Sequence, residues 1–165
     1  RMMIPIYRSA AEDPSPAQLH RVRIVRIALT GMFMMLLTAL AIFGHDLVTL
    51  LYDDRYREAG ALVTLIALAS IPSLIGLSYD QAALARGDSR GFFWVTLVRA
   101  ILFLTLFTVG AVQAGIPGAL AGQALAAVLS YPMLVRLARR HGVWDAWHDL
   151  GYGLLGLALA AVLLG

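Results

Sequence analysis

A charged residue inside an apolar segment is the feature of this sequence best suited to chemistry. Arg99 lies within an apolar run, seven residues after Phe92. A guanidinium binds phosphate oxygens through a planar fork of N–H groups, and a charge inside a membrane span marks a functional site by default. At 1.5 Å per residue Arg99 lies roughly 10 Å from the end of its helix, so its long side chain nearly reaches back to the interface. Two interpretations stay open: a structural, snorkelling residue, or one that lines a substrate path.

Asp80 is the second such residue, and it shares a helix face with Ser70, Ser73 and Gln81. A polar stripe on an apolar helix faces other helices or a wet cavity rather than lipid. A short charged turn separates the runs that hold Asp80 and Arg99, and their depths differ by two residues, or roughly 3 Å. We therefore predict that Asp80 and Arg99 pair directly or face the same cavity.

Small residues repeat at four-residue spacing near the end of the chain. Gly118, Gly122, Ala126 and Ser130 form this ridge, which predicts close packing against another helix. The segment 144–148, Trp-Asp-Ala-Trp-His, is typical of an aromatic anchor at a membrane interface.

The sequence contains none of the common motifs of metal, cofactor or hydrolase sites. It has no Cys, no phosphate-binding loop, no Gly-x-Ser-x-Gly and no His-Glu-x-x-His. His20, His45 and His141 occur in expected loops without the spacing of metal ligands. We therefore expect no catalytic residues, no metal and no cofactor.

The composition indicates which elements must position these residues. Of 165 residues, 60% are hydrophobic and 14% charged, and the mean hydropathy is +0.77. A soluble domain of this size cannot bury so much apolar surface, so the chain is predicted to be an integral membrane protein. The net charge is +3, and all thirteen basic residues are Arg, mostly at the edges of apolar runs. This placement fits a lipid bilayer as the partner, and no nucleic acid is expected.

The apolar runs predict an all-α, antiparallel bundle of about five membrane spans. Residues 1–23 are expected to hold the end of a preceding helix and a cytoplasmic loop, followed by the spans in 24–165. The segment 47–52 is expected at the interface, and 136–149 as a charged loop. Both ends lie in apolar runs, so we expect an internal piece of a longer transporter. The expected spans are 24–43, 59–85, 92–112, 116–135 and 150–165, the last one truncated.

The arginines also predict an orientation. Ten lie on the side of the first loop and two on the opposite side, with Arg99 left out. By the positive-inside rule, the first loop, the turn 86–91 and the loop 136–149 are predicted to be cytoplasmic.

The order of segments resembles a known family of transporters. Pro5-Ile6-Tyr7-Arg8 resembles its Phe-Pro-x-x-Ser-Arg stretch, and residues 52–60 resemble its Gly-x-Arg-Phe/Trp-x-x-Ala segment, with Asp53-Asp54 where Gly is frequent. Residues 115–122 resemble its Gly-x-x-Gly-Ala-Ala stretch. These motifs are similar to those in the C-terminal half of polysaccharide-biosynthesis flippases, in the multidrug/oligosaccharidyl-lipid/polysaccharide exporter superfamily.

The resemblance implies part of one lobe of a MATE-like transporter fold in the bacterial inner membrane. It implies a flippase that moves lipid-linked oligosaccharide, carried on undecaprenyl diphosphate, by alternating access together with the remaining N-terminal half of the same transporter. The substrate-path candidates are then Arg99, Asp80, Gln81, Ser73 and Ser70. The alternative is a membrane enzyme of envelope glycan assembly, a polymerase or acyltransferase, which needs a long extramembrane loop or an embedded His/Asp group. A non-transporting scaffold is a third possibility.

Overall fold

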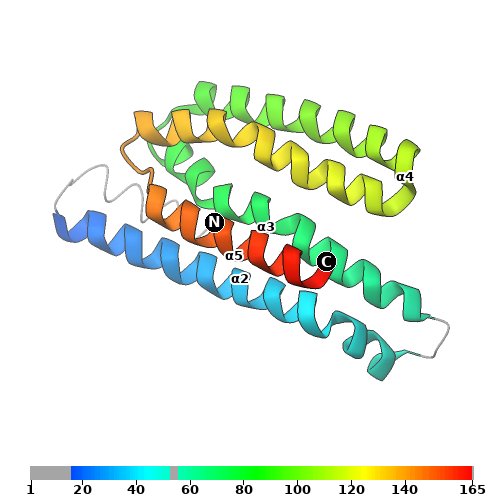
Figure 1. Cartoon of the computed structure of the whole chain (residues 1–165). Coiled ribbons are helices and arrows are strands. Elements are labelled where there is room, and N and C mark those ends of the chain that lie inside the picture. The colour runs from blue at the N-terminus through cyan, green and yellow to red at the C-terminus, as the bar shows by residue number, and fades with distance from the viewer. Residues whose placement is uncertain (1–15, 53–55, 165) are drawn as a thin grey trace.

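The computed structural model describes residues 16–52 and 56–164, and all regular secondary structure in these ranges is helical. The all-α fold class is therefore confirmed for this part of the chain. Figure 1 shows the helices lying roughly parallel or antiparallel to one another. The elements are α2 (Pro16–Leu51), α3 (Arg57–Ala85), α4 (Ser89–Arg140) and α5 (Ala146–Leu164).

Each of these helices is long and apolar enough to cross a membrane. Large hydrophobic side chains cover their outer surface; Leu50, Val112 and Val162 are each at least 80% exposed. Soluble monomers rarely expose large contiguous apolar patches. The structure thus agrees with a multi-pass membrane protein.

The longest element, α4, folds back on itself. Its 52 residues would make a straight helix about 78 Å long, more than twice the ~30 Å core of a bilayer. The backbone leaves helical geometry at Ala114 and at Gly115, whose φ of +62° favours glycine. Two arms, 89–113 and 116–140, result and lie side by side in Figure 1. They correspond to the expected spans 92–112 and 116–135.

Glycines let the two arms of α4 approach to backbone contact. A Cβ atom at Gly110 would overlap the carbonyl of Gly118, and one at Gly122 would overlap the carbonyl of Leu106. Any side chain at these positions would therefore push the arms apart.

The first span is longer than the sequence predicted. The expected limits 24–43 are wrong, because α2 begins at Pro16 and continues to Leu51. Proline is compatible with the first turn of a helix, where its missing N–H is not needed. Gly44 does not end the helix; it lies where a Cβ would come closer than 3.0 Å to Val63 of α3. The expected interfacial segment 47–52 forms the last turns of α2 up to residue 51.

The expected loop 136–149 is also wrong. Helix α4 continues to Arg140, and α5 begins at Ala146, so the connection is only 141–145. Gly142, with φ +62°, ends the first helix, and the side chain of Asp145 caps the second by accepting from the His148 N–H at 3.3 Å. The expected limits 150–165 therefore miss the first turn of α5, which has 19 residues and is long enough to span.

Helix α3 lies at the centre of the bundle and packs against each of the other elements. Because successive segments are antiparallel, the start of α2, the turn 86–88 and the loop 141–145 meet at one end (Figure 1). At the opposite end, the described helices carry Arg57, the first residue of α3. The arginine-rich end holds Arg23, Arg26, Arg86, Arg90, Arg136, Arg139 and Arg140.

Candidate functional site

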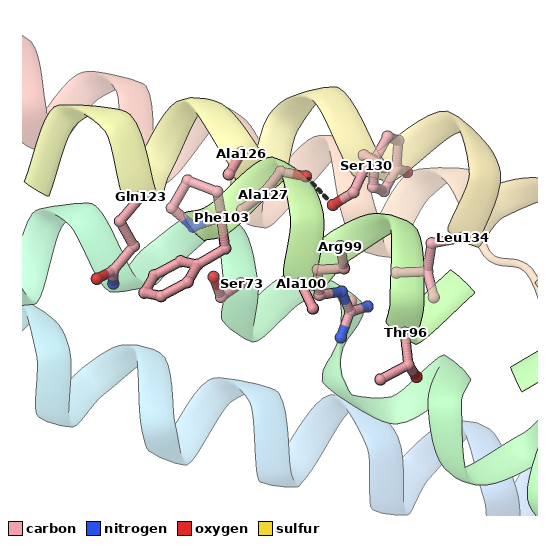
Figure 2. Close-up of a pocket in the computed structure, with 13 residues that line it drawn as sticks. Ser73, Thr96, Arg99, Ala100, Phe103, Gln123, Ala126, Ala127, Ser130 and Leu134 are labelled. Carbon is pink, nitrogen blue, oxygen red and sulfur yellow. Dashed lines mark hydrogen bonds between the residues drawn. The ribbon is translucent and has the colours of Figure 1, made fainter. Parts of the chain in front are cut away.

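A cavity of about 240 Å³ lies between α3 and the two arms of α4. Figure 2 shows Arg99, from the first arm, extending into this space above α3. Gly76 of α3 leaves room for Leu134 of the second arm, since a Cβ there would come closer than 3.0 Å to the Leu134 side chain. The other polar residues of the wall are Ser73, Thr96, Gln123, Ser130 and Tyr131.

This cavity joins one cation to hydroxyl and amide groups inside an apolar bundle. Arg99 is half-buried. The Ser130 hydroxyl is buried and donates to the Ala127 carbonyl at 3.0 Å, as drawn in Figure 2. Phe103 and Leu134 supply apolar wall. The arrangement can bind an anionic group together with neighbouring hydroxyl groups.

The predicted site residues have different places in the structure. Arg99 and Ser73 line the same cavity, whereas Ser70 donates to the Ile66 carbonyl of its own helix at 2.7 Å and is not part of the wall. The side chains of Asp80 and Gln81 lie outside the described part of the structure, so the predicted pairing of Asp80 with Arg99 stays a prediction. The backbone puts position 80 one helical turn after Gly76.

The small-residue ridge is divided between two surroundings. Gly118 and Gly122 meet the first arm of α4. Ala126 and Ser130, both buried, line the cavity with Arg99. The ridge therefore contributes to packing at one end and to the cavity wall at the other.

A second polar group, absent from the predicted site, is centred on the carboxylate of Asp149 in α5. This carboxylate accepts from the Tyr79 hydroxyl at 2.7 and 2.8 Å and from the Tyr131 hydroxyl at 2.6 Å. Nδ1 of His148 lies 2.9 Å from its Oδ1. Tyr79, His148 and Asp149 are all buried, so three helices, α3, α4 and α5, are joined at one buried charge. We call Tyr79, Tyr131, His148 and Asp149 the Asp149 cluster.

Two arginines of α2 reach the loop beside this cluster. Arg23 Nε and Arg26 Nη2 lie 3.0 and 3.2 Å from Oδ2 of Asp145. Arg26 is buried, also donates to the Val143 carbonyl, and lies 5.4 Å from the centre of the Tyr79 ring. Burial opposes ionisation of Asp145, but the His148 N–H and the two guanidinium groups outweigh it and lower the pKa of this carboxyl.

The sequence interpretation of 144–148 as an aromatic anchor holds for only part of the segment. Trp147 is 79% exposed, as an interfacial residue would be. Trp144 is half-buried under the guanidinium of Arg139, 3.9 Å from the ring centre, and His148 is buried. Asp145 stands directly before Ala146 and Trp147, and an Asp just before an apolar run is an N-cap signal that could have indicated this helix start.

Comparisons of the chain with models of protein families found no match, and comparisons with curated proteins and with solved structures found none either.

Proposed function

We propose that this chain forms part of a flippase that moves lipid-linked oligosaccharide, carried on undecaprenyl diphosphate, across the bacterial inner membrane. The observation that carries the proposal is the cavity in which Arg99 lies among hydroxyl and amide groups of α3 and α4. The order of sequence motifs supports the same family, with a MATE-like lobe and cytoplasmic loops at the arginine-rich end.

The chemistry of the cavity matches such a substrate. A diphosphate is recognised by the fork of a guanidinium, and sugar hydroxyls are recognised by hydroxyl and amide side chains. Ser73, Thr96 and Gln123 supply these groups around Arg99. In an alternating-access cycle, the cavity would open to each side in turn as this lobe moves against its partner lobe.

The test replaces Arg99 in cells that carry the variant as their only copy. Arg99→Gln removes the charge, and Arg99→Lys keeps it but loses the fork. We expect lipid-linked oligosaccharide to accumulate on the cytoplasmic face in Arg99→Gln, with partial transport in Arg99→Lys. Arg90→Gln is the matched control, because Arg90 is exposed and lies outside the cavity wall. Normal transport in Arg99→Gln at normal protein yield would refute the proposal.

A double-mutant cycle tests the predicted partner of Arg99. Asp80→Asn, Arg99→Gln and the double variant are compared for folded yield and transport. If the two residues are coupled, each single change should lower the yield more than the double change, because it leaves one charge buried alone. Strict additivity would rule out the coupling.

For the alternative, a membrane enzyme of glycan assembly, the structure offers the buried pair of His148 and Asp149. Nδ1 of His148 faces the carboxylate, an arrangement that orients an imidazole as a base. A loss of glycan synthesis in His148→Asn, with lipid-linked oligosaccharide still crossing the membrane in the same cells, would favour the enzyme over the flippase.

A further inference from the structure

We propose that the cleft between α2 and α5 binds the phosphate of an anionic phospholipid. This cavity, of about 380 Å³, is separate from the one that holds Arg99. The proposal depends on the membrane location of the chain and is independent of the proposed flippase activity. The cleft is lined by Arg23, Ile27, Trp147, His148, Tyr152 and Leu155, together with Asp145.

Positive charge exceeds negative charge immediately around Asp145. Two guanidinium groups contact this carboxylate: Arg23 in the wall of the cleft, and the buried Arg26 behind it. The other oxygen of that carboxylate accepts from the His148 backbone N–H. Asp149 does not line the cleft, and its charge is met by the hydroxyl donors of α3 and α4. Arg23, with 57% of its side chain exposed, therefore presents positive charge to an incoming anion.

His148 also lies in the wall of the cleft. Its side chain is 1% exposed, and among the described residues its Nε2 has no hydrogen-bond partner. Its Nδ1 lies 2.9 Å from Oδ1 of Asp149. A buried polar atom without a partner is costly, so a polar headgroup atom that reached Nε2 would be stabilised there.

The remaining walls fit a lipid rather than a soluble phosphate. Ile27 and Leu155 are apolar and at least 40% exposed, and they continue the cleft along the helices. Trp147 is exposed at its rim, as is typical of residues at headgroup level. The cleft lies at the arginine-rich end of the bundle, where anionic headgroups are attracted.

The experiment measures lipid retention by the purified whole chain in detergent, using native mass spectrometry. The probes are phosphatidylglycerol and phosphatidylcholine with identical acyl chains, with glycerol phosphate as a soluble competitor. We expect phosphatidylglycerol to be retained in preference to phosphatidylcholine, and its binding to weaken by about fivefold in Arg23→Gln, the effect of one basic residue near an anionic surface.

Two further variants distinguish binding in the cleft from non-specific attraction to the arginines at this end of the bundle. His148→Asn keeps an N–H that can donate to Asp149 but has no atom at the position of Nε2, so binding should weaken while thermal unfolding shows whether the fold is kept. Arg90→Gln removes an exposed arginine at the same end, outside the cleft, and should leave binding unchanged. If His148→Asn does not fold, the comparison of Arg23→Gln with Arg90→Gln decides alone.

Three results would overturn the proposal. The first is equal retention of phosphatidylglycerol and phosphatidylcholine. The second is an equal loss of binding in Arg23→Gln and Arg90→Gln. The third is complete displacement of the lipid by glycerol phosphate, which would make the cleft a site for soluble phosphates.

Discussion

Removal of the Tyr79 hydroxyl tests whether the Asp149 cluster stabilises the bundle. Tyr79 is fully buried, and its hydroxyl lies 2.7 and 2.8 Å from the two oxygens of Asp149. Tyr79→Phe keeps the ring and removes only this donor. A hydrogen bond to a buried charge contributes about 1.5–3 kcal/mol, and we expect the free energy of unfolding to fall by this amount. Neutral hydrogen bonds between membrane helices average only about 0.6 kcal/mol.

The measurement is reversible unfolding in mixed micelles, followed by helical circular dichroism. Tyr152→Phe is the matched control, since its hydroxyl makes one long bond of 3.3 Å to the Ile27 carbonyl. We expect that control to lose less than about 1 kcal/mol, as for a weak neutral bond. Equal losses in the two variants would refute the view that the buried charge depends on Tyr79.

We also expect the residues of the Asp149 cluster to contribute cooperatively to the free energy of unfolding. Tyr131→Phe removes the other hydroxyl donor, which lies 2.6 Å from Asp149. In the double variant, Tyr79→Phe with Tyr131→Phe, the carboxylate keeps only His148 among the donors of the cluster. The combined loss should exceed the sum of the single losses, because contacts to one buried charge are not independent. Additive losses would mean that water replaces the missing hydroxyl groups.

Three more predictions concern topology, packing and acid stability. In intact cells, the cysteine of Ser89→Cys should be protected from a membrane-impermeant thiol reagent, whereas that of Gln113→Cys, at the opposite end of the bundle, should be labelled. The reverse pattern would overturn the predicted cytoplasmic location of the arginine-rich end. Gly122→Ala should lower the free energy of unfolding by about 1–3 kcal/mol, because the new Cβ overlaps the first arm of α4. The control Gly151→Ala should leave it unchanged, because Gly151 has open space around it. Similar denaturation midpoints for the two variants would contradict close packing of the α4 arms. Folding lowers the pKa of Asp145, so this group stabilises the fold at pH values above the ordinary carboxyl pKa, and the stabilisation is lost as pH falls through the folded pKa. The free energy of unfolding should therefore drop less below about pH 4 in Asp145→Asn than in the unchanged chain. An equal drop in both would exclude Asp145 as the cause.

Apolar runs predicted the helices well, because a membrane span must satisfy all its backbone groups internally. The errors lie at helix ends. Gly44 resembles a helix stop in sequence, yet α2 passes through it, since the missing side chain makes room for α3. The end of α4 before Gly142 and the start of α5 after Asp145 depend on caps, which a pattern of apolar residues does not show.

The two polar sites differ in how far sequence could predict them. Arg99 stands out because a charge inside an apolar run is rare. Tyr79 and Asp149 do not, since each lies near a span end, where polar residues are common. They are 70 residues apart, and only the packing of α5 beside α3 brings them together. A single sequence holds no local pattern for that contact.

The fold-back of α4 has a consequence for how the chain enters the membrane during synthesis. Its tip, residues 112–116, is Val-Gln-Ala-Gly-Ile and carries no charge. Moving a charged loop across the hydrocarbon core is costly, whereas this tip has only two backbone positions outside helical geometry. The two arms are in backbone contact at Gly110 and Gly118, close to the tip, so the pair can insert as one preassembled hairpin. By the positive-inside rule, we expect the arginines at its base to stay on the side of insertion and the uncharged tip to be the end that crosses.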